Sequence, residues 1–196
     1  MAVVKINLPV TEEEIRKLKV GDQVLLSGII STGRDAAHKY IMENHPDFIR
    51  PYFENGVLYH CGPVVGKNED GSWKFVAAGP TTSIREEPYE AHVIEEYKLR
   101  GVIGKGGMRE KTLEALKKHG AVYLHAVGGA AAMQASAVKE VIDVFLLEEL
   151  GVPEAFWIIR VEDFPVVVTM DSHGNSLHDV IREKSSKIAD DLIHGK

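Results

Sequence analysis

Cysteine is almost absent from this chain of 196 residues, which contains only Cys61. One thiol cannot form a disulfide within the chain, so the composition favours a reducing compartment. One thiol also cannot hold an iron–sulfur cluster, because such clusters usually take about four protein thiolates. We therefore interpret Cys61 as a small buried residue.

Long apolar runs and an excess of basic residues are also missing. No stretch reaches the ~20 apolar residues that a membrane-spanning helix needs. The first ten residues contain Lys5 and no small-residue cleavage site, so we expect no signal peptide. A net charge of −6 disfavours a nucleic-acid binder with a generally basic surface. Together these absences predict a soluble, cytoplasmic protein.

The order of the predicted elements is typical of an α/β protein. The length fits a single domain over residues 1–196. Strands are expected at 3–8, 23–31, 57–60, 102–103, 122–126, 141–147, 156–161 and 166–170, with a hairpin formed by 64–67 and 73–78. Helices are expected from Thr11, which begins a capping box with Glu14, at 34–44, around 88–97, up to His119, and at 177–192. This alternation predicts a mainly parallel sheet with helices packed on it and an extra β layer from the hairpin.

Three loops share one design, in which small residues and one cation follow a predicted strand and precede a helix. They are Ser31–Arg34, Thr81–Arg85 and Gly104–Gly107, and their cations are Arg34, Arg85 and Lys105. Ligands of α/β sheets bind at the carboxyl ends of strands, where helix N-termini attract anions. Arginine adds a forked grip on a carboxylate and lysine adds a point charge. The three loops therefore predict a site for a small polyanion, such as a dicarboxylate or a phosphate ester.

Each loop alone also has a simpler interpretation. Arg34 can be a surface cation paired with Asp35, Thr81-Thr82-Ser83 can be a helix cap, and Gly104–Gly107 can be a tight turn. The same position at the end of a strand is used three times, and this repetition favours a binding site over three unrelated features.

Other motifs that carry chemistry are not found. The sequence lacks a P-loop, a complete dinucleotide fingerprint, a G-x-S-x-G elbow and an H-E-x-x-H helix. Four histidines, His38, His60, His125 and His173, are interpreted as structural or supporting residues rather than metal ligands. We therefore predict no metal site on this chain.

Five segments carry a family resemblance, and they occur in the family's order. The β subunit of class I (iron–sulfur) fumarate hydratases is closely resembled by Gly21-Asp22 with Leu26-Ser27-Gly28, Gly33-Arg34-Asp35-Ala36-Ala37-His38, Gly62-Pro63-Val64, Gly79-Pro80-Thr81-Thr82-Ser83-x-Arg85 and Gly104-Lys105-Gly106-Gly107-Met108. The same family includes the β subunit of L-tartrate dehydratase and the C-terminal half of single-chain class I fumarases. The resemblance covers nearly the whole chain. The segments 34–38 and 126–131 look more like fumarase than tartrate dehydratase.

The resemblance implies a swivelling β/β/α three-layer domain and a hydro-lyase that interconverts fumarate and (S)-malate. Arg34, Arg85 and Lys105 would bind the substrate carboxylates, and Thr81 would be the catalytic base. A partner α subunit would carry the [4Fe–4S] cluster, so this chain would be inactive alone. It would work as part of a hetero-oligomer, with a homodimer possible in isolation.

Alternatives to this reading lie inside and outside the family. The chain could be the β subunit of L-tartrate dehydratase or of another hydroxy-dicarboxylate dehydratase. It could also be a non-catalytic anion-binding or assembly subunit. A threonine hydroxyl is a very weak base without help from a neighbour, and the candidates for that help are Lys105 and Asp35.

Overall fold

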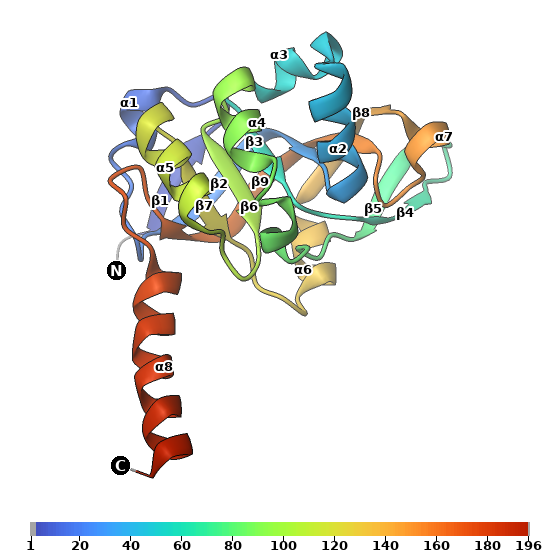
Figure 1. Cartoon of the computed structure of the whole chain (residues 1–196). Coiled ribbons are helices and arrows are strands. Elements are labelled where there is room, and N and C mark those ends of the chain that lie inside the picture. Colours follow the sequence, from blue (N-terminus) through green and yellow to red (C-terminus); the bar gives the residue numbers. More distant parts are fainter. Residues whose placement is uncertain (1–2, 196) are drawn as a thin grey trace.

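Seven strands form one mainly parallel sheet in a computed structural model, which describes residues 3–195 (Figure 1). Their order across the sheet is β1-β2-β3-β6-β7-β9-β8. Their bounds are Val3–Asn7 (β1), Gln23–Thr32 (β2), Val57–Tyr59 (β3), Gly101–Gly104 (β6), Val122–His125 (β7), Phe156–Met170 (β9) and Val138–Phe145 (β8). The predicted α/β class with a mainly parallel sheet is confirmed.

Strand β9 changes the direction of the sheet. The neighbouring strands β1, β2, β3, β6 and β7 pair in parallel. Strand β9 runs antiparallel to β2, β7 and β8. Because β9 pairs with both β2 and β7, the hydrogen-bonded neighbours form a circuit through β2, β3, β6, β7 and β9.

The predicted hairpin is confirmed as a separate two-stranded sheet. Strand β4 (Val64–Lys67) pairs antiparallel with β5 (Trp73–Ala77). Trp73 and Phe75 pack edge-on against the buried ring of Trp157 on β9, with ring centroids 5.3 and 5.9 Å apart. The hairpin therefore covers part of the main sheet, as expected for an extra β layer.

Helices lie between and beside the strands. They are α1 (Glu12–Ile15), α2 (Asp35–Asn44), α3 (Arg50–Phe53), α4 (Glu90–Tyr97), α5 (Glu110–His119), α6 (Ala131–Ser136), α7 (Leu147–Leu150) and α8 (Leu177–His194), with 3-10 turns η1 (Asp47–Ile49) and η2 (Ser83–Glu86). The capping box of α1 is confirmed, because Thr11 Oγ1 accepts the Glu14 N–H and the Glu14 carboxylate accepts the Thr11 N–H. None of the helices within residues 3–195 is long and apolar enough to cross a bilayer.

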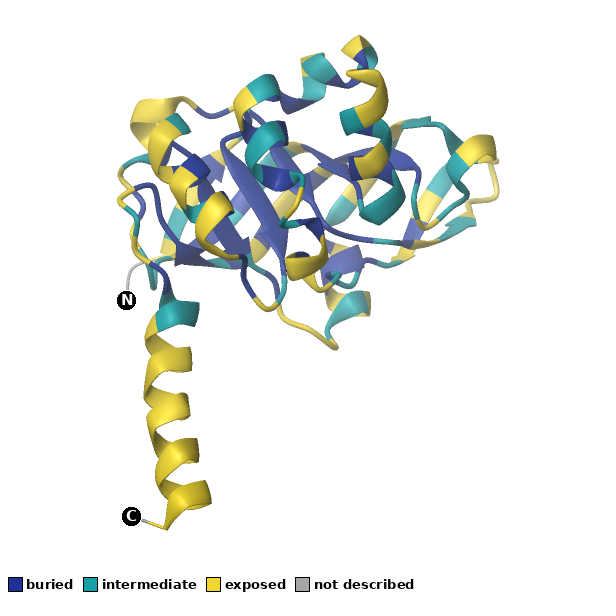
Figure 2. Cartoon of the chain, in the orientation of Figure 1, coloured by how far each residue is buried: buried dark blue, intermediate teal, exposed yellow. Residues whose placement is uncertain are grey.

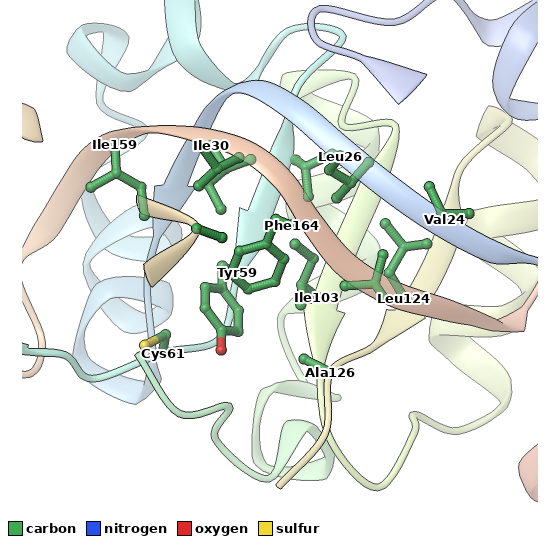
Figure 3. Close-up of a cluster of buried hydrophobic side chains, with 14 of the residues drawn as sticks. Val24, Leu26, Ile30, Tyr59, Cys61, Ile103, Leu124, Ala126, Ile159 and Phe164 are labelled. Carbon is green, nitrogen blue, oxygen red and sulfur yellow. The ribbon is translucent and has the colours of Figure 1, made fainter. Parts of the chain in front are cut away.

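Successive residues of the central strands enter two different cores, as the alternation of side chains along a strand requires. Leu58, Val102 and Tyr123 pack with the apolar faces of α2, α4 and α5. Their neighbours Tyr59, Ile103 and Leu124 instead point toward side chains of β2 and β9, which include Leu26, Ile30 and Phe164 (Figure 3). Both cores therefore share the strands whose ends carry the predicted site.

Two expectations about the C-terminal third need correction. The strands predicted at 156–161 and 166–170 are one continuous strand, β9, in which Asp163 has a positive φ of 48°. Helix α8 has nearly the predicted bounds, but it extends away from the sheet instead of packing on it (Figure 2). Its apolar residues Ile188 and Leu192 are 61% and 80% exposed. The periodicity therefore identified the helix correctly but not its packing.

Candidate active site

Arg34 and Arg85 are brought together by one carboxylate. Arg34 lies immediately before α2 and shortly after β2, and Arg85 lies in η2. The Asp35 Oδ2 atom is 3.7 Å from Arg34 Nη2 and 3.0 Å from Arg85 Nη2. The local pair of Arg34 with Asp35 therefore exists, and Asp35 also connects the first predicted loop to the second.

Arg34 has a second acidic neighbour, Glu154, and the absence of a side chain at Gly62 leaves room for the Arg34 guanidinium. Its Nε lies 3.1 Å from Glu154 Oε1, and the other oxygen of Glu154 accepts the backbone N–H of Ala36 at 3.0 Å. A Cβ at Gly62 would overlap the guanidinium of Arg34. The Arg34 and Arg85 side chains remain 24% and 45% exposed, so both cations reach solvent.

Thr81 and Lys105 are connected through the backbone. The Lys105 N–H donates to the carbonyl of Thr81 at 3.2 Å, and the Ser83 N–H donates to the carbonyl of Lys105 at 3.0 Å. The Thr81 N–H donates to the carbonyl of His60, just after β3, at 2.6 Å. The second and third predicted loops therefore lie side by side at the ends of adjacent strands β3 and β6.

The helix-cap interpretation of Thr81-Thr82-Ser83 does not describe this loop. Thr82 precedes η2, but its side chain makes no capping hydrogen bond there. The Ser83 hydroxyl instead accepts a hydrogen bond from the Tyr123 hydroxyl at 2.8 Å and contacts His60 Nδ1 at 2.9 Å. The Ser83 side chain thus connects the loop to the buried residues His60 and Tyr123.

Beneath the loops lies a buried cluster of His38, His60 and Glu90, none of which has measurable exposure. The Glu90 Oε2 atom is 3.0 Å from His38 Nε2 and 2.9 Å from His60 Nε2. Within residues 3–195, this cluster and a surface group of His45, His92 and Glu96 are the two sets of ligand atoms close enough together to hold a metal ion.

Burial and charge set the proton affinities of this cluster. Burial favours a neutral His38, but the hydrogen bond and negative charge of Glu90 outweigh burial and raise the pKa of His38 to about 9. Burial lowers the pKa of His60. Burial would raise the pKa of Glu90, yet the two histidines lower it to about 2. The pKa of His38 is therefore raised within the cluster, whereas those of His60 and Glu90 are lowered.

Glu90 was not predicted from the sequence, although a signal for it exists. It shares the apolar face of α4 with Val93, Ile94 and Tyr97, all of which are buried. A carboxylate at spacings of three, four and seven from apolar residues lies on the buried face of a helix. Such a group needs a partner, and histidine is a suitable one.

Comparison with known proteins shows to which family the chain belongs. The family model described as the fumarase C-terminus matches residues 1–181. This chain belongs to that family. The loops that carry Arg34, Thr81, Arg85 and Lys105 all lie within the matched residues.

Curated relatives of this chain include proteins of two kinds. A protein of Geobacillus stearothermophilus, provisionally named fumarate hydratase class I, is 57% identical over 185 residues. The match covers 94% of this chain but only 35% of that relative, so the chain spans about a third of its length.

Further relatives are named as separate subunits. A Methanocaldococcus jannaschii protein, provisionally named L(+)-tartrate dehydratase subunit beta, is 42% identical, with 93% of this chain and 95% of the relative covered. The L(+)-tartrate dehydratase subunit beta of Escherichia coli is 38% identical, with 88% and 85% covered. Members of the family therefore occur both within long chains and as subunits about as long as this chain.

Cys61 is unsuited to ligate an iron–sulfur cluster. Its side chain is buried, as predicted, and burial raises the pKa of the thiol to about 12. A cluster ligand must be a thiolate, and about four are usually needed. The residues of this chain therefore cannot supply the cluster that the resemblance implies.

The remaining predicted histidines lie outside the buried cluster. His125 ends β7, and burial lowers its pKa. His173 follows β9, and its Nε2 contacts the carbonyl of Arg16 at 2.9 Å. Of the four histidines, only His38 and His60 contact a common carboxylate beneath the predicted site.

Proposed function

We propose that this chain is the carboxylate-binding part of a class I fumarate hydratase, which interconverts fumarate and (S)-malate. The observation that carries the proposal is the convergence of the three loops, through Asp35 between Arg34 and Arg85 and through the backbone between Thr81 and Lys105. Such an arrangement suits a substrate with two carboxylates a few bonds apart.

In this proposal, Arg34, Arg85 and Lys105 bind and orient the two carboxylates. Arginine donates two parallel hydrogen bonds to a carboxylate, which fixes its orientation as well as its position. Removal of a proton next to a carboxylate builds negative charge on the substrate. Fixed cations stabilise that charge without reorganisation of solvent.

Thr81 is proposed to transfer the proton at the substrate carbon. Its hydroxyl needs a cationic neighbour to hold it in the deprotonated form. Lys105 is our candidate for this role, because its backbone N–H donates to the Thr81 carbonyl at 3.2 Å and so keeps the two residues adjacent. Asp35 is less suitable, since its carboxylate carries no positive charge and already contacts two guanidinium groups.

An α-type partner, or an equivalent domain, is proposed to supply the [4Fe–4S] cluster. The names of two relatives include the words "subunit beta", and the chain spans about a third of the fumarase relative. The single buried cysteine supports ligation of the cluster by another polypeptide. We accordingly propose that the isolated chain does not turn over substrate.

L-tartrate dehydratase is the second candidate function. The two relatives named L(+)-tartrate dehydratase subunit beta support it, because they are 42% and 38% identical to this chain. The higher identity to the fumarase relative, 57% against 42% and 38%, favours fumarate. Both substrates are dicarboxylates, so the same cations would bind either.

We further propose that residues 1–196 act as one domain of the swivelling β/β/α type in the cytoplasm. The two cores on opposite faces of the same strands support a single layered unit. A lone, buried thiol is compatible with a reducing compartment.

The test is anaerobic co-expression with an α-type partner, followed by assays of the complex on fumarate, (S)-malate and L-tartrate. We expect Arg85→Ala to lower kcat/KM for fumarate at least ~100-fold, because a charged hydrogen-bonded pair contributes about 1.5–3 kcal/mol and its charge also stabilises the transition state. We expect Thr81→Val to abolish turnover while (S)-malate still binds.

Arg160→Ala is the matched control, since Arg160 is similarly exposed at 55% and pairs with Glu140 on β8. Its complex should retain wild-type kcat/KM. Unchanged turnover in Arg85→Ala and Thr81→Val would instead identify an assembly subunit. Turnover of L-tartrate without turnover of fumarate would establish the second candidate.

A further inference from the structure

The buried cluster beneath the loops has hydrogen-bond partners that restrict where its protons lie. The Nδ1 atom of His38 faces the carbonyl oxygen of Arg34 at 2.8 Å. A carbonyl only accepts hydrogen bonds, so Nδ1 must carry a proton. The opposite ring atom, Nε2, faces Glu90 at 3.0 Å, and one proton lies between them. Imidazole is about two pKa units more basic than a carboxylate, so this proton belongs on His38.

The second histidine, His60, differs from His38 in that its Nδ1 accepts a hydrogen bond instead of donating one. Its Nε2 lies 2.9 Å from the same Glu90 oxygen and donates to it. Its Nδ1 is then free to accept the hydrogen of the Ser83 hydroxyl at 2.9 Å. The Tyr123 hydroxyl donates to Ser83 at 2.8 Å. The chain of donors therefore runs from Tyr123 through Ser83 to His60, and both histidines donate to Glu90.

The hydrogen-bonded network of these buried residues contacts all three cationic loops. His38 holds the carbonyl of Arg34, and the backbone carbonyl of His60 accepts the Thr81 N–H at 2.6 Å. Ser83 donates its N–H to the carbonyl of Lys105 at 3.0 Å. A Cβ at Gly104 would overlap Ser83 Oγ, so the strand before Lys105 is packed directly against the same serine.

The contacts at Glu90 match hydrogen bonds better than metal coordination. Two ligands of one zinc ion, each about 2.0–2.1 Å from it, lie roughly 3.3 Å apart in a tetrahedral site. Here a single carboxylate oxygen lies 2.9 and 3.0 Å from two ring nitrogens. The other ring nitrogens of both histidines already have hydrogen-bond partners.

We propose that His38, Glu90, His60 and Ser83 are positioning residues that hold the three cationic loops in register, with His38 as an imidazolium and His60 as a neutral ring. The role in catalysis rests on the proposed function, whereas the proton positions do not. Charged and titratable groups face His38 from three elements: Glu90 on α4, Glu86 on η2, with an oxygen 3.9 Å from His38 Nδ1, and His60 after β3.

The first test measures the ring nitrogens of His38 and His60 in the ¹⁵N-labelled full chain by NMR at about pH 7.5. We expect both ring nitrogens of His38 to be protonated, with the midpoint of its titration near pH 9. His60 should carry one proton, at Nε2. Ser83→Ala should shift the Nδ1 signal of His60 and leave His38 doubly protonated. A neutral His38 or a cationic His60 would overturn the assignment. Stoichiometric binding of added Zn²⁺ that His38→Gln abolishes would overturn it as well.

The second test measures kinetics in the complex with the α-type partner. Tyr123→Phe removes the first donor of the chain, and we expect kcat/KM to fall roughly three- to tenfold, mainly through kcat, as for the loss of one buried hydrogen bond. Tyr97→Phe is the matched control, because the Tyr97 hydroxyl is also buried but donates to the carbonyl of Pro46, outside the chain of donors.

Equal kinetic effects of the two tyrosine variants would overturn the positioning role, since general destabilisation would then explain both. A wild-type complex without hydro-lyase activity would refute the proposed function and the positioning role with it. The NMR result would still decide the proton positions, so the two failures are distinguishable.

Discussion

Replacing Gly104 with alanine would test how closely the third loop is packed against the buried cluster. Gly104 ends β6 immediately before Lys105. An added Cβ would overlap Ser83 Oγ and lie 2.9 Å from the Tyr123 hydroxyl. The backbone of Gly104 has no positive φ, so alanine is penalised there by the contact alone. Ser83 must move, and its hydrogen bonds with His60 and Tyr123 are then lost.

The size of the effect follows from those two bonds. Each buried polar group left without a partner costs about 1–3 kcal/mol. Losing partners for the Tyr123 hydroxyl and for His60 Nδ1 should therefore lower the free energy of unfolding by about 2–6 kcal/mol. For a chain of this length, about 2–4 °C in Tm is lost per kcal/mol, which predicts a decrease of roughly 4–24 °C.

Urea unfolding of the full chain measures this loss. Gly66→Ala, in β4, is the control, because a Cβ there would lie at least 3.5 Å from its neighbours, and we expect no loss of stability. Ser83→Ala combined with Gly104→Ala should cost less than the sum of the single changes, because the overlapping oxygen is gone. Strictly additive losses, or a Gly104→Ala chain as stable as wild type, would refute the reasoning.

Three further predictions concern stability. The pKa of His38 is about 9 in the folded chain, above its unfolded value of about 6.5. Its contribution to the free energy of unfolding is therefore fully present below pH 6.5 and is lost as pH rises through 9. His38→Gln should flatten this decline in stability, measured by urea unfolding at a series of pH values. Arg100→Met should cost about 2–4 kcal/mol, because the guanidinium donates to the Asn55 side chain and to the carbonyls of His119 and Gly120; a loss below ~1 kcal/mol would contradict this. Deleting residues 183–196 should change the unfolding free energy by less than ~1 kcal/mol, because that part of α8 is exposed; a larger loss would mean that it packs on the sheet.

Local signals predicted most of the fold. The capping box at Thr11, the cations before Gly120 and the turn between β4 and β5 depend on neighbouring residues, and each lies where it was expected. The short helices α3, α6 and α7 were not predicted, because four to six residues give too little periodicity to recognise.

Long-range packing could not be predicted in the same way. Nothing local indicates that β9 continues through Asp163 and pairs with three different strands. The apolar stripe of α8 predicts a buried face, yet no other part of the described chain covers it. Periodicity reports that a face is apolar and does not report what lies against it.

The candidate site was predicted in part. The rule that ligands bind at strand ends placed Arg34, Thr81, Arg85 and Lys105 in one region, and their loops do converge there. The residues below them were interpreted only as structural histidines. Glu90, which joins His38 to His60, is 52 and 30 residues away from them in sequence, so only the fold brings the three together.

The most direct measurement is a crystal structure of the complex between this chain and its α-type partner with fumarate or (S)-malate bound. We expect carboxylate oxygens within about 2.7–3.2 Å of nitrogen atoms of Arg34, Arg85 and Lys105, with the Thr81 hydroxyl facing the substrate carbons. A dicarboxylate bound in the same complex without contact to any of these three cations would contradict it.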